Sequence, residues 1–417
     1  MGSPVKNTKL KWFYPDSNLD SDFVYVFRRE PSWRWIRVDD SYISQKPELQ
    51  EMEAVYGKYG EGKVLNYTGV VNNSDVTKSF ESGYYLVSNP FPVAIDWDKD
   101  EGWEREGFST TIWSWITING YRTVQTINNG VAAIKPEGYS DENASHIPPY
   151  QAVQMKVVAG NAKLTIKREA RVKNSNAPLK SAAGQQSSYN LIRIQTDNNL
   201  QIDGTLIYFN DTFINGASDE DSEKQFNSSE NVPEIYTRIN NSAYAINGFP
   251  ELTDSEYSIP ISVRNRVEAD VTMAFDLKEF GGGYTVYLED KETGSWINLL
   301  QQSEYVYTPA QMGDDHDRFV LHLEKIQQVA TGINQPDTES TDDIEIVGYE
   351  DYAQIQISNE LLQTSDAEID LLDMNGRLLN KVTTRQTQNN VDLPDNSGVY
   401  IIRVNIGDVV KTGKVVR

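Results

Sequence analysis

The sequence of 417 residues contains no cysteine. This absence excludes disulfides, thiolate metal sites and a cysteine nucleophile together. It leaves the compartment open, because an exported chain can also avoid cysteine. Histidine is scarce as well, with only His146, His316 and His322, so few residues could serve as the base of a histidine-activated nucleophile. We therefore expect no enzyme activity in this chain.

Basic residues and long apolar runs are also in short supply. Against 61 Asp and Glu stand 38 Lys and Arg, which gives a net charge of −23. Phosphate binding needs a basic face, so we expect no nucleic-acid partner. No stretch approaches the ~18 apolar residues of a membrane helix, and the start has no apolar segment of a secretory signal. Because strand-like sequence begins as early as Lys9, we expect the chain to be the C-terminal region of a longer protein.

The sequence is rich in short β-type runs separated by Gly, Pro, Asn and Asp, while helical periodicity is nearly missing. The clearest runs are Phe23–Phe27, Trp33–Val38, Tyr84–Val87, Thr110–Trp115, Ala152–Val157 and Lys163–Ile166. One short helix is expected at Pro47–Glu53. Dense short strands with frequent turns predict an all-β chain of tandem β-sandwich-like domains.

Two polar segments suggest the domain boundaries, because a single core seldom grows beyond ~250–300 residues. Residues 172–188 are small and polar, as in a linker. Residues 331–343 carry four acids and no base, so they cannot bury enough surface to order themselves. The prediction is an aromatic-rich β-domain at 1–172, a second β-sandwich at 188–330, an acidic linker at 331–343 and a final domain at 344–417.

The final domain reads as a small immunoglobulin-like sandwich of seven strands. The predicted strands are Ile344–Val347, Gln354–Ile357, Ala367–Asp373, Leu378–Thr383, Asn390–Leu393, Gly398–Asn405 and Val409–Val416. Asn375-Gly376 predicts a two-residue hairpin, because both positions of a type I′ turn need positive φ.

Three segments of this domain carry a family resemblance. They are the hairpin Ile369–Leu379 with Asp373, Asn375, Gly376 and Arg377, the segment Asp392–Val404 with Gly398 and Tyr400, and the end Lys411–Arg417 with Lys411, Lys414 and Arg417. Together they resemble the type A sorting domain at the C-terminus of cargo of the Bacteroidetes type IX secretion system. Ser397 departs from the family, which often has Pro there.

The resemblance implies an export signal that the outer-membrane translocon reads once the chain has reached the periplasm. It also implies a sortase-like peptidase that removes the domain and anchors the passenger to lipopolysaccharide, so the protein is secreted or displayed on the cell surface. Residues 403–417 contain one acidic residue, Asp408, and four basic residues, Arg403, Lys411, Lys414 and Arg417. This local basic character suits a docking edge, although an ordinary charged edge strand would look the same.

Segments upstream are similar to sequence that commonly precedes this sorting domain in large Bacteroidetes surface proteins. They are Ser82–Trp97, Ile147–Ala152 and Asp314–Leu323. This resemblance implies location and architecture, and it assigns no activity. We expect adhesin or spacer domains.

Two acidic clusters are candidate calcium sites, since hard cations bind several oxygens at close range. The first is Asp96, Asp98 and Asp100, and the second includes Asp219 and Asp221. Neither follows the EF-hand pattern, and solvated acidic turns are the alternative. Otherwise we expect no cofactor.

Tryptophan is concentrated near the start, with seven of the eight in the first 115 residues. Trp33 and Trp35, and likewise Trp113 and Trp115, lie two apart, so each pair projects from one face of a strand. Aromatic faces beside polar groups suit sugar rings, and the alternative is that this face is a sandwich core. The second functional hypothesis is therefore a carbohydrate-binding module region attached to an upstream extracellular hydrolase.

Overall fold

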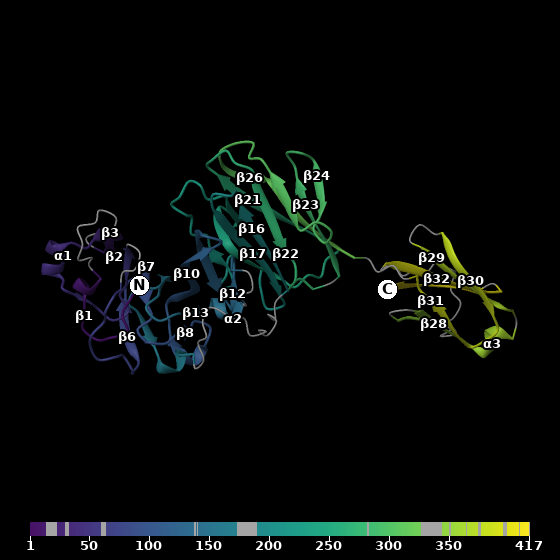
Figure 1. Ribbon diagram of the computed structural model, residues 1–417, viewed down its shortest axis with the longest axis horizontal. Coiled ribbons are helices and arrows are strands. Elements are labelled where there is room, and N and C mark those ends of the chain that lie inside the picture. The colour runs from purple at the N-terminus through teal and green to yellow at the C-terminus, as the bar shows by residue number, and fades with distance from the viewer. Residues whose placement is uncertain are drawn as a thin grey trace. The chain divides into compact units, whose positions relative to one another are not determined.

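The computed structural model describes residues 1–13, 23–29, 33–59, 64–136, 139, 141–172, 190–281, 283–326, 344–349, 352–363, 365–373, 377–394, 398–407 and 409–416. The chain forms two compact units, Met1–Ile326 and Gln327–Arg417 (Figure 1). Strands dominate both units, so the all-β prediction is confirmed. The acidic segment 331–343 and residues 173–188 lie outside the described residues. In the described part of the chain, no helix has the length and apolarity to cross a membrane.

A small three-stranded sheet opens the first unit, in the order β3-β2-β5. Its strands are β2 (Phe23–Arg29), β3 (Trp33–Arg37) and β5 (Val55–Lys58). Alternation in β2 sends Val24 and Val26 into a core with Leu10, Phe13 and Val55. The aromatic residues of β2 therefore lie on the opposite face.

The helix expected at Pro47–Glu53 is wrong. Glu48–Leu49 forms strand β4, which pairs with β1 (Thr8–Lys9), and η1 (Leu10–Trp12) follows β1. The first helix is instead α1 (Asp40–Gln45), where the Asp39 carboxylate accepts the Tyr42 N–H at 2.8 Å as an N-cap. The pairing of Glu48–Leu49 with Thr8–Lys9 therefore replaces the expected helix.

The next part is a sandwich of a five-stranded and a three-stranded sheet. The first sheet runs β12 (Val131–Ala132), β11 (Tyr121–Asn128), β10 (Phe108–Ile118), β14 (Ala152–Val157), β7 (Gly83–Ser88). The second runs β6 (Val76–Phe80), β15 (Ala162–Ile166), β9 (Trp103–Glu104). Their facing side chains form one core that includes Ile112, Met155 and Leu164. Connections carry β8 (Ile95–Asp96) paired with β13 (His146–Ile147), α2 (Asp141–Ala144), η2 (Asp100–Gly102) and η3 (Arg168–Ala170).

Two of the segments singled out in the sequence meet in this sandwich. The Asn89 amide donates to the carbonyls of Val93 at 2.8 Å and Ile147 at 2.9 Å, and its oxygen accepts the Phe91 N–H at 2.8 Å. Asn89 is buried, so these bonds satisfy an otherwise costly polar group. The Asn-Pro-Phe-Pro and Ile-Pro-Pro segments therefore hold the fold together.

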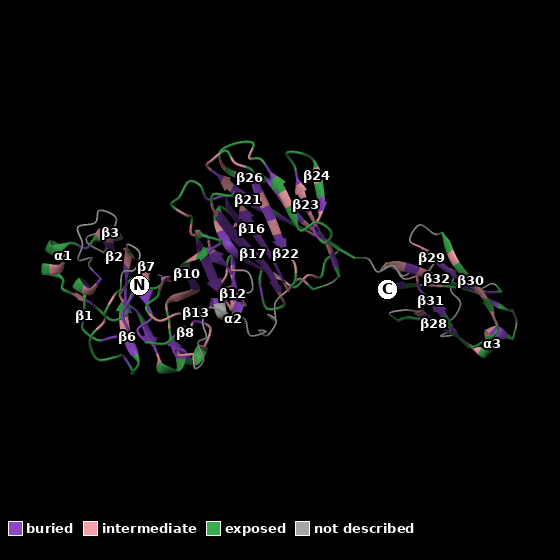
Figure 2. Ribbon diagram, viewed as in Figure 1, coloured by how far each residue is buried: buried purple, intermediate pink, exposed green. Residues whose placement is uncertain are grey.

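The rest of the first unit is an eleven-stranded sheet. The order is β24 (Ser295–Asn298), β23 (Tyr284–Asp290), β26 (Gly313–Lys325), β21 (Glu256–Asn265), β19 (Glu234–Ile239), β20 (Ser242–Pro250), β17 (Ile202–Asn210), β16 (Asn190–Asp197), β22 (Val271–Asp276), β25 (Glu304–Tyr307), with β18 (Ser222–Glu223) paired to β20. Both halves of the sheet contribute to one core, for example Ile194 from β16 and Leu321 from β26. The sheet thus folds over, so that its two halves pack against each other as a sandwich, and Figure 2 shows the buried residues along its strands.

The two sandwiches have separate cores and also share buried contacts, so residues 1–326 form one compact unit. A mixed cluster joins Val131 and Ala133 to Leu206 and Tyr208. Arg193 of β16 reaches across, and its Nη2 lies 2.9 and 3.0 Å from the two Asp141 carboxylate oxygens. The interface between the parts predicted as 1–172 and 188–330 therefore resembles a protein core, with buried apolar contacts and a buried ion pair.

The second unit is the expected seven-strand sandwich, with sheets β27-β28-β31 and β30-β29-β32-β33. Its strands are β27 (Ile344–Gly348), β28 (Tyr352–Ile357), β29 (Ala367–Asp373), β30 (Leu378–Thr384), β31 (Gln388–Asp392), β32 (Val399–Ile406) and β33 (Val409–Val416), with α3 (Asn359–Leu362) between β28 and β29. Ile355, Ile369, Ile402 and others close one core. All seven predicted strands are present.

The hairpin between β29 and β30 is described up to Asp373 and from Arg377 onward. The Asp373 N–H donates to the Arg377 carbonyl at 2.9 Å, and the pairing shifts between Leu371 and Leu372. Asn375 and Gly376 themselves lie outside the described residues.

Candidate functional site

A groove with a volume of about 790 Å³ lies in the first unit, inside the ~300–1,000 Å³ range of ligand pockets. Its floor is the outer face of the sheet β12-β11-β10-β14-β7. One wall is the aromatic face of β3-β2-β5, and the other wall comes from residues 201 and 225–232 of the second sandwich. Chain segments far apart in sequence thus build one site.

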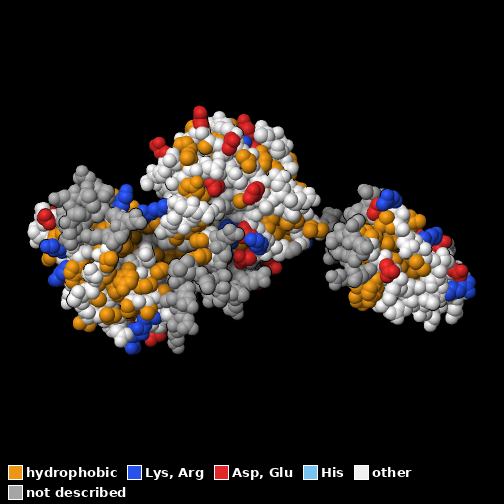
Figure 3. All heavy atoms as spheres, viewed as in Figure 1, with side chains coloured by type: hydrophobic (Ala, Val, Ile, Leu, Met, Phe, Trp, Pro, Cys, Tyr) orange, Lys and Arg blue, Asp and Glu red, His pale blue; other side chains and the backbone are white. Residues whose placement is uncertain are grey.

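The floor consists of side chains that point away from the core of the first sandwich. Trp115 lies opposite Val124, and Gln154 lies opposite both Trp113 and Leu86. All five line the groove. Figure 3 shows hydrophobic side chains gathered on the surface of this part of the first unit.

The aromatic wall follows from the alternation in β2. Phe23 and Tyr25 project from β2 beside Trp35 of β3 and Tyr56 of β5, and all four line the groove. Ring centroids lie 5.4 Å apart for Phe23 and Tyr25 and 5.7 Å apart for Trp35 and Tyr56. These spacings are those of favourable edge-to-face pairs, so the rings form a continuous platform.

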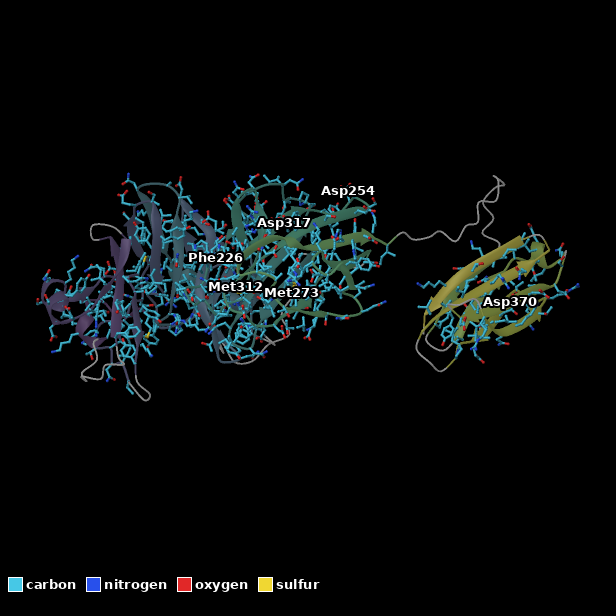
Figure 4. All side chains as sticks on the ribbon, turned by 90° about the horizontal axis from the view of Figure 1, so that it is seen from above. Phe226, Asp254, Met273, Met312, Asp317 and Asp370 are labelled. Carbon is cyan, nitrogen blue, oxygen red and sulfur yellow. The ribbon has the colours of Figure 1, made fainter. Side chains whose placement is uncertain are left out.

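The opposite wall is a loop that a buried charge cluster holds in place. The Asn227 N–H donates to Glu234 Oε1 at 2.7 Å, and Arg266 Nη2 donates to the Ser229 carbonyl at 2.8 Å. Burial, with the nearby Asp203 carboxylate, raises the pKa of Glu234 to about 7, although Lys224 opposes the shift. Phe226 of this loop, labelled in Figure 4, is partly exposed and lines the groove.

The polar side chains in the groove are almost all uncharged. They are Gln151, Gln154, Gln201, Gln225, Asn227, Ser228 and Ser229. No Asp or Glu is among the described residues that line the groove, and Arg122 is the sole charged side chain there. The groove thus presents aromatic faces beside amides and hydroxyls.

The structure brings three of the four predicted tryptophans to this groove. Trp35 and Trp115 are 44% and 39% exposed, so their rings are accessible. Trp113 is 1% exposed, and its indole N–H donates to the Glu223 carbonyl at 3.1 Å, so it supports the floor from below. Trp33 belongs to β3, and its side chain lies outside the described residues. The sequence pattern missed Phe23, Tyr25 and Tyr56, although alternation in 23–27 already separated aromatic from aliphatic residues.

Segment 219–223 of the second sandwich is fastened to the same sheet face next to the groove. Glu223 accepts from Lys156 Nζ at 2.6 Å and from the Tyr84 hydroxyl at 2.8 Å. Burial raises the pKa of the Glu223 carboxyl, but these two partners outweigh burial and leave the pKa below its ordinary value. Glu223 is therefore a structural anion that joins the two sandwiches.

The first calcium candidate is not assembled as the sequence suggested. Asp96 Oδ1 accepts the Asp98 N–H at 3.0 Å and the Ser145 hydroxyl at 2.8 Å. Burial and the neighbouring Asp96 raise the pKa of Asp98 to about 6. Asp100 is 96% exposed and pairs with Arg105 at 3.6 Å. Asp96 and Asp98 both interact with Ser145, whereas Asp100 points to solvent, so the three carboxylates do not converge on one point.

The second calcium candidate has the same outcome. Asp221 accepts the N–H groups of Ser218 and Gly248, both at 2.8 Å, and Asp219 is exposed. In the described part of the chain, no three Asp, Glu or His side chains lie close enough to hold a metal ion. The carboxylates fix loop geometry instead.

The three histidines are spread across the first unit. His322 Nε2 lies 2.9 Å from Glu289 Oε2, and its ring stacks on Trp296 at 4.5 Å. His146 lies 4.0 Å from Asp96, and His316 packs edge-on against Tyr236. None of the three lines the groove.

The second unit carries a row of charges across its four-stranded sheet. Asp370, labelled in Figure 4, lies opposite Lys381 on one side and Arg403 on the other. Arg403 Nη2 donates to Asp370 Oδ2 at 2.7 Å, and Lys381 Nζ lies 2.9 Å from Glu368. Arg403 is therefore neutralised within its own sheet, contrary to its inclusion in a free basic end.

Most of the predicted sorting residues lie near one end of this sheet, where Asp373 pairs with Tyr400 and Ile401 with Lys414. Arg377 Nε lies 3.4 Å from the Asp373 carboxylate in the hairpin, and Tyr400 is buried in the core above Gly398. Lys411 and Lys414 are exposed on β33, and their odd spacing puts them on opposite faces. Arg417 lies outside the described residues.

The described architecture is that of an all-β passenger followed by a separate small immunoglobulin-like domain at the C-terminal end. Residues 349–417 match the family model described as the secretion system C-terminal sorting domain. The last domain is thus a type IX secretion sorting domain, and the protein is exported to the cell surface or exterior.

Comparisons with whole proteins add little to this assignment. No curated protein matches the chain. A solved structure titled "Biofilm associated protein - BSP domain" is similar at 11% identity and a TM-score of 0.16, and the match covers 82% of this chain and 66% of that chain. At this TM-score the likeness carries no argument.

Proposed function

We propose that residues 1–326 are a non-catalytic, carbohydrate-binding passenger that the sorting domain brings to the cell surface. The supporting observation is the groove, where the accessible rings of Trp35 and Trp115 lie beside amides and hydroxyls from three parts of the fold. C–H faces of sugars stack on aromatic rings, while their hydroxyls exchange hydrogen bonds with amides. On a surface protein such a groove serves adhesion to a glycan.

The absence of Asp and Glu from the described groove lining supports binding without hydrolysis. Glycoside hydrolysis usually needs a pair of carboxyl groups on either side of the scissile bond. The alternative function, a carbohydrate-binding module for an upstream extracellular hydrolase, uses the same groove. It differs only in what the longer protein contains.

The proposal is tested on the whole chain, because residues of the second sandwich form one wall of the groove. A glycan array identifies ligands, and calorimetry then compares Trp35→Ala and Trp115→Ala with Trp296→Ala. Trp296 is 53% exposed on β24 and does not line the groove, which makes it a matched control. We expect the two groove variants to lose about five- to tenfold in affinity, and Trp296→Ala to lose none.

Two results would contradict the proposed function. One is an array without hits. The other is equal affinity in all three tryptophan variants, which would place binding elsewhere.

For the sorting domain we propose the partners that the family resemblance implies. The outer-membrane translocon recognises the folded domain, a sortase-like peptidase removes it, and the passenger is anchored to lipopolysaccharide. The exposed cations Lys411 and Lys414 on β33 support recognition at this strand.

A further inference from the structure

Arg122 stands out in the groove because of its charge. The chain carries 61 acidic residues, yet no Asp or Glu is among the described residues that line the groove. Arg122 is exposed, and no carboxylate of the described residues lies within ion-pair distance of its guanidinium. Some arginines elsewhere in the first unit are neutralised by a carboxylate, as Arg193 is by Asp141 and Arg318 by Asp290.

Neighbouring groups hold the Arg122 guanidinium in place without neutralising it. Its Nη1 donates to the Tyr56 hydroxyl at 2.6 Å, and its Cζ lies 4.9 Å from the centroid of the Tyr56 ring. Arg122 lies opposite Thr117 near the end of the hairpin, on the same face as Trp115. A pre-positioned guanidinium therefore sits where the aromatic wall meets the floor, and a planar fork of donors matches a carboxylate.

We propose that the groove selects acidic polysaccharides, with Arg122 binding the carboxylate of a uronic acid residue while the rings of Trp35 and Trp115 pack on the sugar faces. This inference rests on the proposed function and names its ligand class. A carboxylate can accept two parallel hydrogen bonds from the Arg122 guanidinium and also pairs its charge, whereas a neutral sugar hydroxyl offers neither the second acceptor nor the charge.

The test uses one polymer in two chemical states. Calorimetry measures binding of the whole chain to alginate oligosaccharides and to the same oligosaccharides after chemical reduction of their carboxyl groups to alcohols. We expect the acidic form to bind about tenfold more tightly. Arg122→Gln should remove this preference while leaving the affinity for the reduced form unchanged, and Arg122→Lys should keep part of it.

Lys163→Gln is the charge-matched control, because Lys163 is exposed on β15 and does not line the groove. It should bind both forms as the unsubstituted protein does. A thermal melt of each variant shows whether loss of the Tyr56 contact has disturbed the fold. If Arg122→Gln lowers the melting temperature, the Arg122→Lys variant decides the question. A partly kept preference for the acidic form supports the proposal, and a complete loss of that preference overturns it.

The outcomes separate the two levels of the proposal. Equal binding of both forms, or a preference that survives Arg122→Gln, overturns the selection of acidic glycans and leaves carbohydrate binding standing. Loss of both forms in Arg122→Gln, with an unchanged melt, makes Arg122 a general sugar ligand and also overturns it. If neither form binds and no other glycan does, the proposed function itself falls.

Discussion

At the scale of single residues, the buried charges near the groove are the most informative. Glu234 and Asp203 are fully buried beside Lys224, and Arg266 lies 3.6 Å from the other oxygen of Glu234. Glu234 is also the residue that accepts the Asn227 N–H in the groove wall. Its ionisation therefore bears on both the stability and the shape of this wall.

The Glu234 site predicts a pH-dependent stability of the first unit. Burial raises the pKa of Glu234 from 4.5 to about 7, so the folded state binds the proton more tightly than the unfolded state. This contribution is fully present below about pH 4.5 and is lost as the pH rises through about 7. Glu234→Gln keeps an acceptor for Asn227 and removes the titration. The difference between wild-type and variant unfolding free energies should change by on the order of 3 kcal/mol over this range.

Urea unfolding at several pH values between 4.5 and 8 measures this difference. Glu256→Gln provides the control, because Glu256 is exposed on β21. Parallel stability curves for wild type and Glu234→Gln would show that Glu234 does not titrate in this range.

At the scale of elements, strand β33 combines a structural and a proposed signalling role. It pairs with β32 over its whole length, and its Val415 is 2% exposed in the core of the sorting domain. Deleting residues 411–417 would therefore unfold the sheet as well as remove the signal. Point changes at its exposed cations separate the two effects.

We predict that Lys411→Glu together with Lys414→Glu leaves the protein in the periplasm of the bacterium that exports it. The two side chains are exposed, so the sheet should persist while the charge presented to the export machinery is reversed. Cell fractionation with immunoblotting reads the location. The control variant Lys163→Glu, in the first unit, should be displayed normally. Normal display of the double variant would show that the charge of β33 is not part of the export signal.

At the scale of the whole molecule, the two sandwiches of the first unit depend on each other. Gly204 of β17 shows how tightly they pack, since a Cβ at this position would lie 2.8 Å from Ile134 Cβ and 3.1 Å from the Ala133 carbonyl oxygen. Backbone lies on that side, so the neighbours cannot easily move away.

Gly204→Ala should therefore destabilise the first unit by about 1–3 kcal/mol through overpacking. Gly160→Ala is the control, because its new Cβ would meet only the Glu81 carboxylate at 3.9 Å. Thermal melts of both variants check this. Since the groove spans the interface, Gly204→Ala should also weaken glycan binding, whereas unchanged binding would mean that the walls do not depend on this contact.

The sequence by itself determined the strand content, the seven strands of the sorting domain and its export role. Alternation along a strand is a local signal that a short stretch carries alone. The sorting motif likewise lies within the final domain. The expected helix at Pro47–Glu53 failed because Glu48–Leu49 pairs with the distant strand Thr8–Lys9, a contact that the local pattern does not reveal.

Only the tertiary structure decided where the site is. Trp35, Phe226 and the hairpin that carries Trp115 and Arg122 belong to separate sheets and loops, and no spacing in the sequence links these three parts. Conversely, Asp96, Asp98 and Asp100 are close in sequence, yet the backbone directs Asp100 to solvent. Local pattern sets which face of a strand a side chain occupies, but burial and long-range packing select which faces meet, and that choice produced the groove.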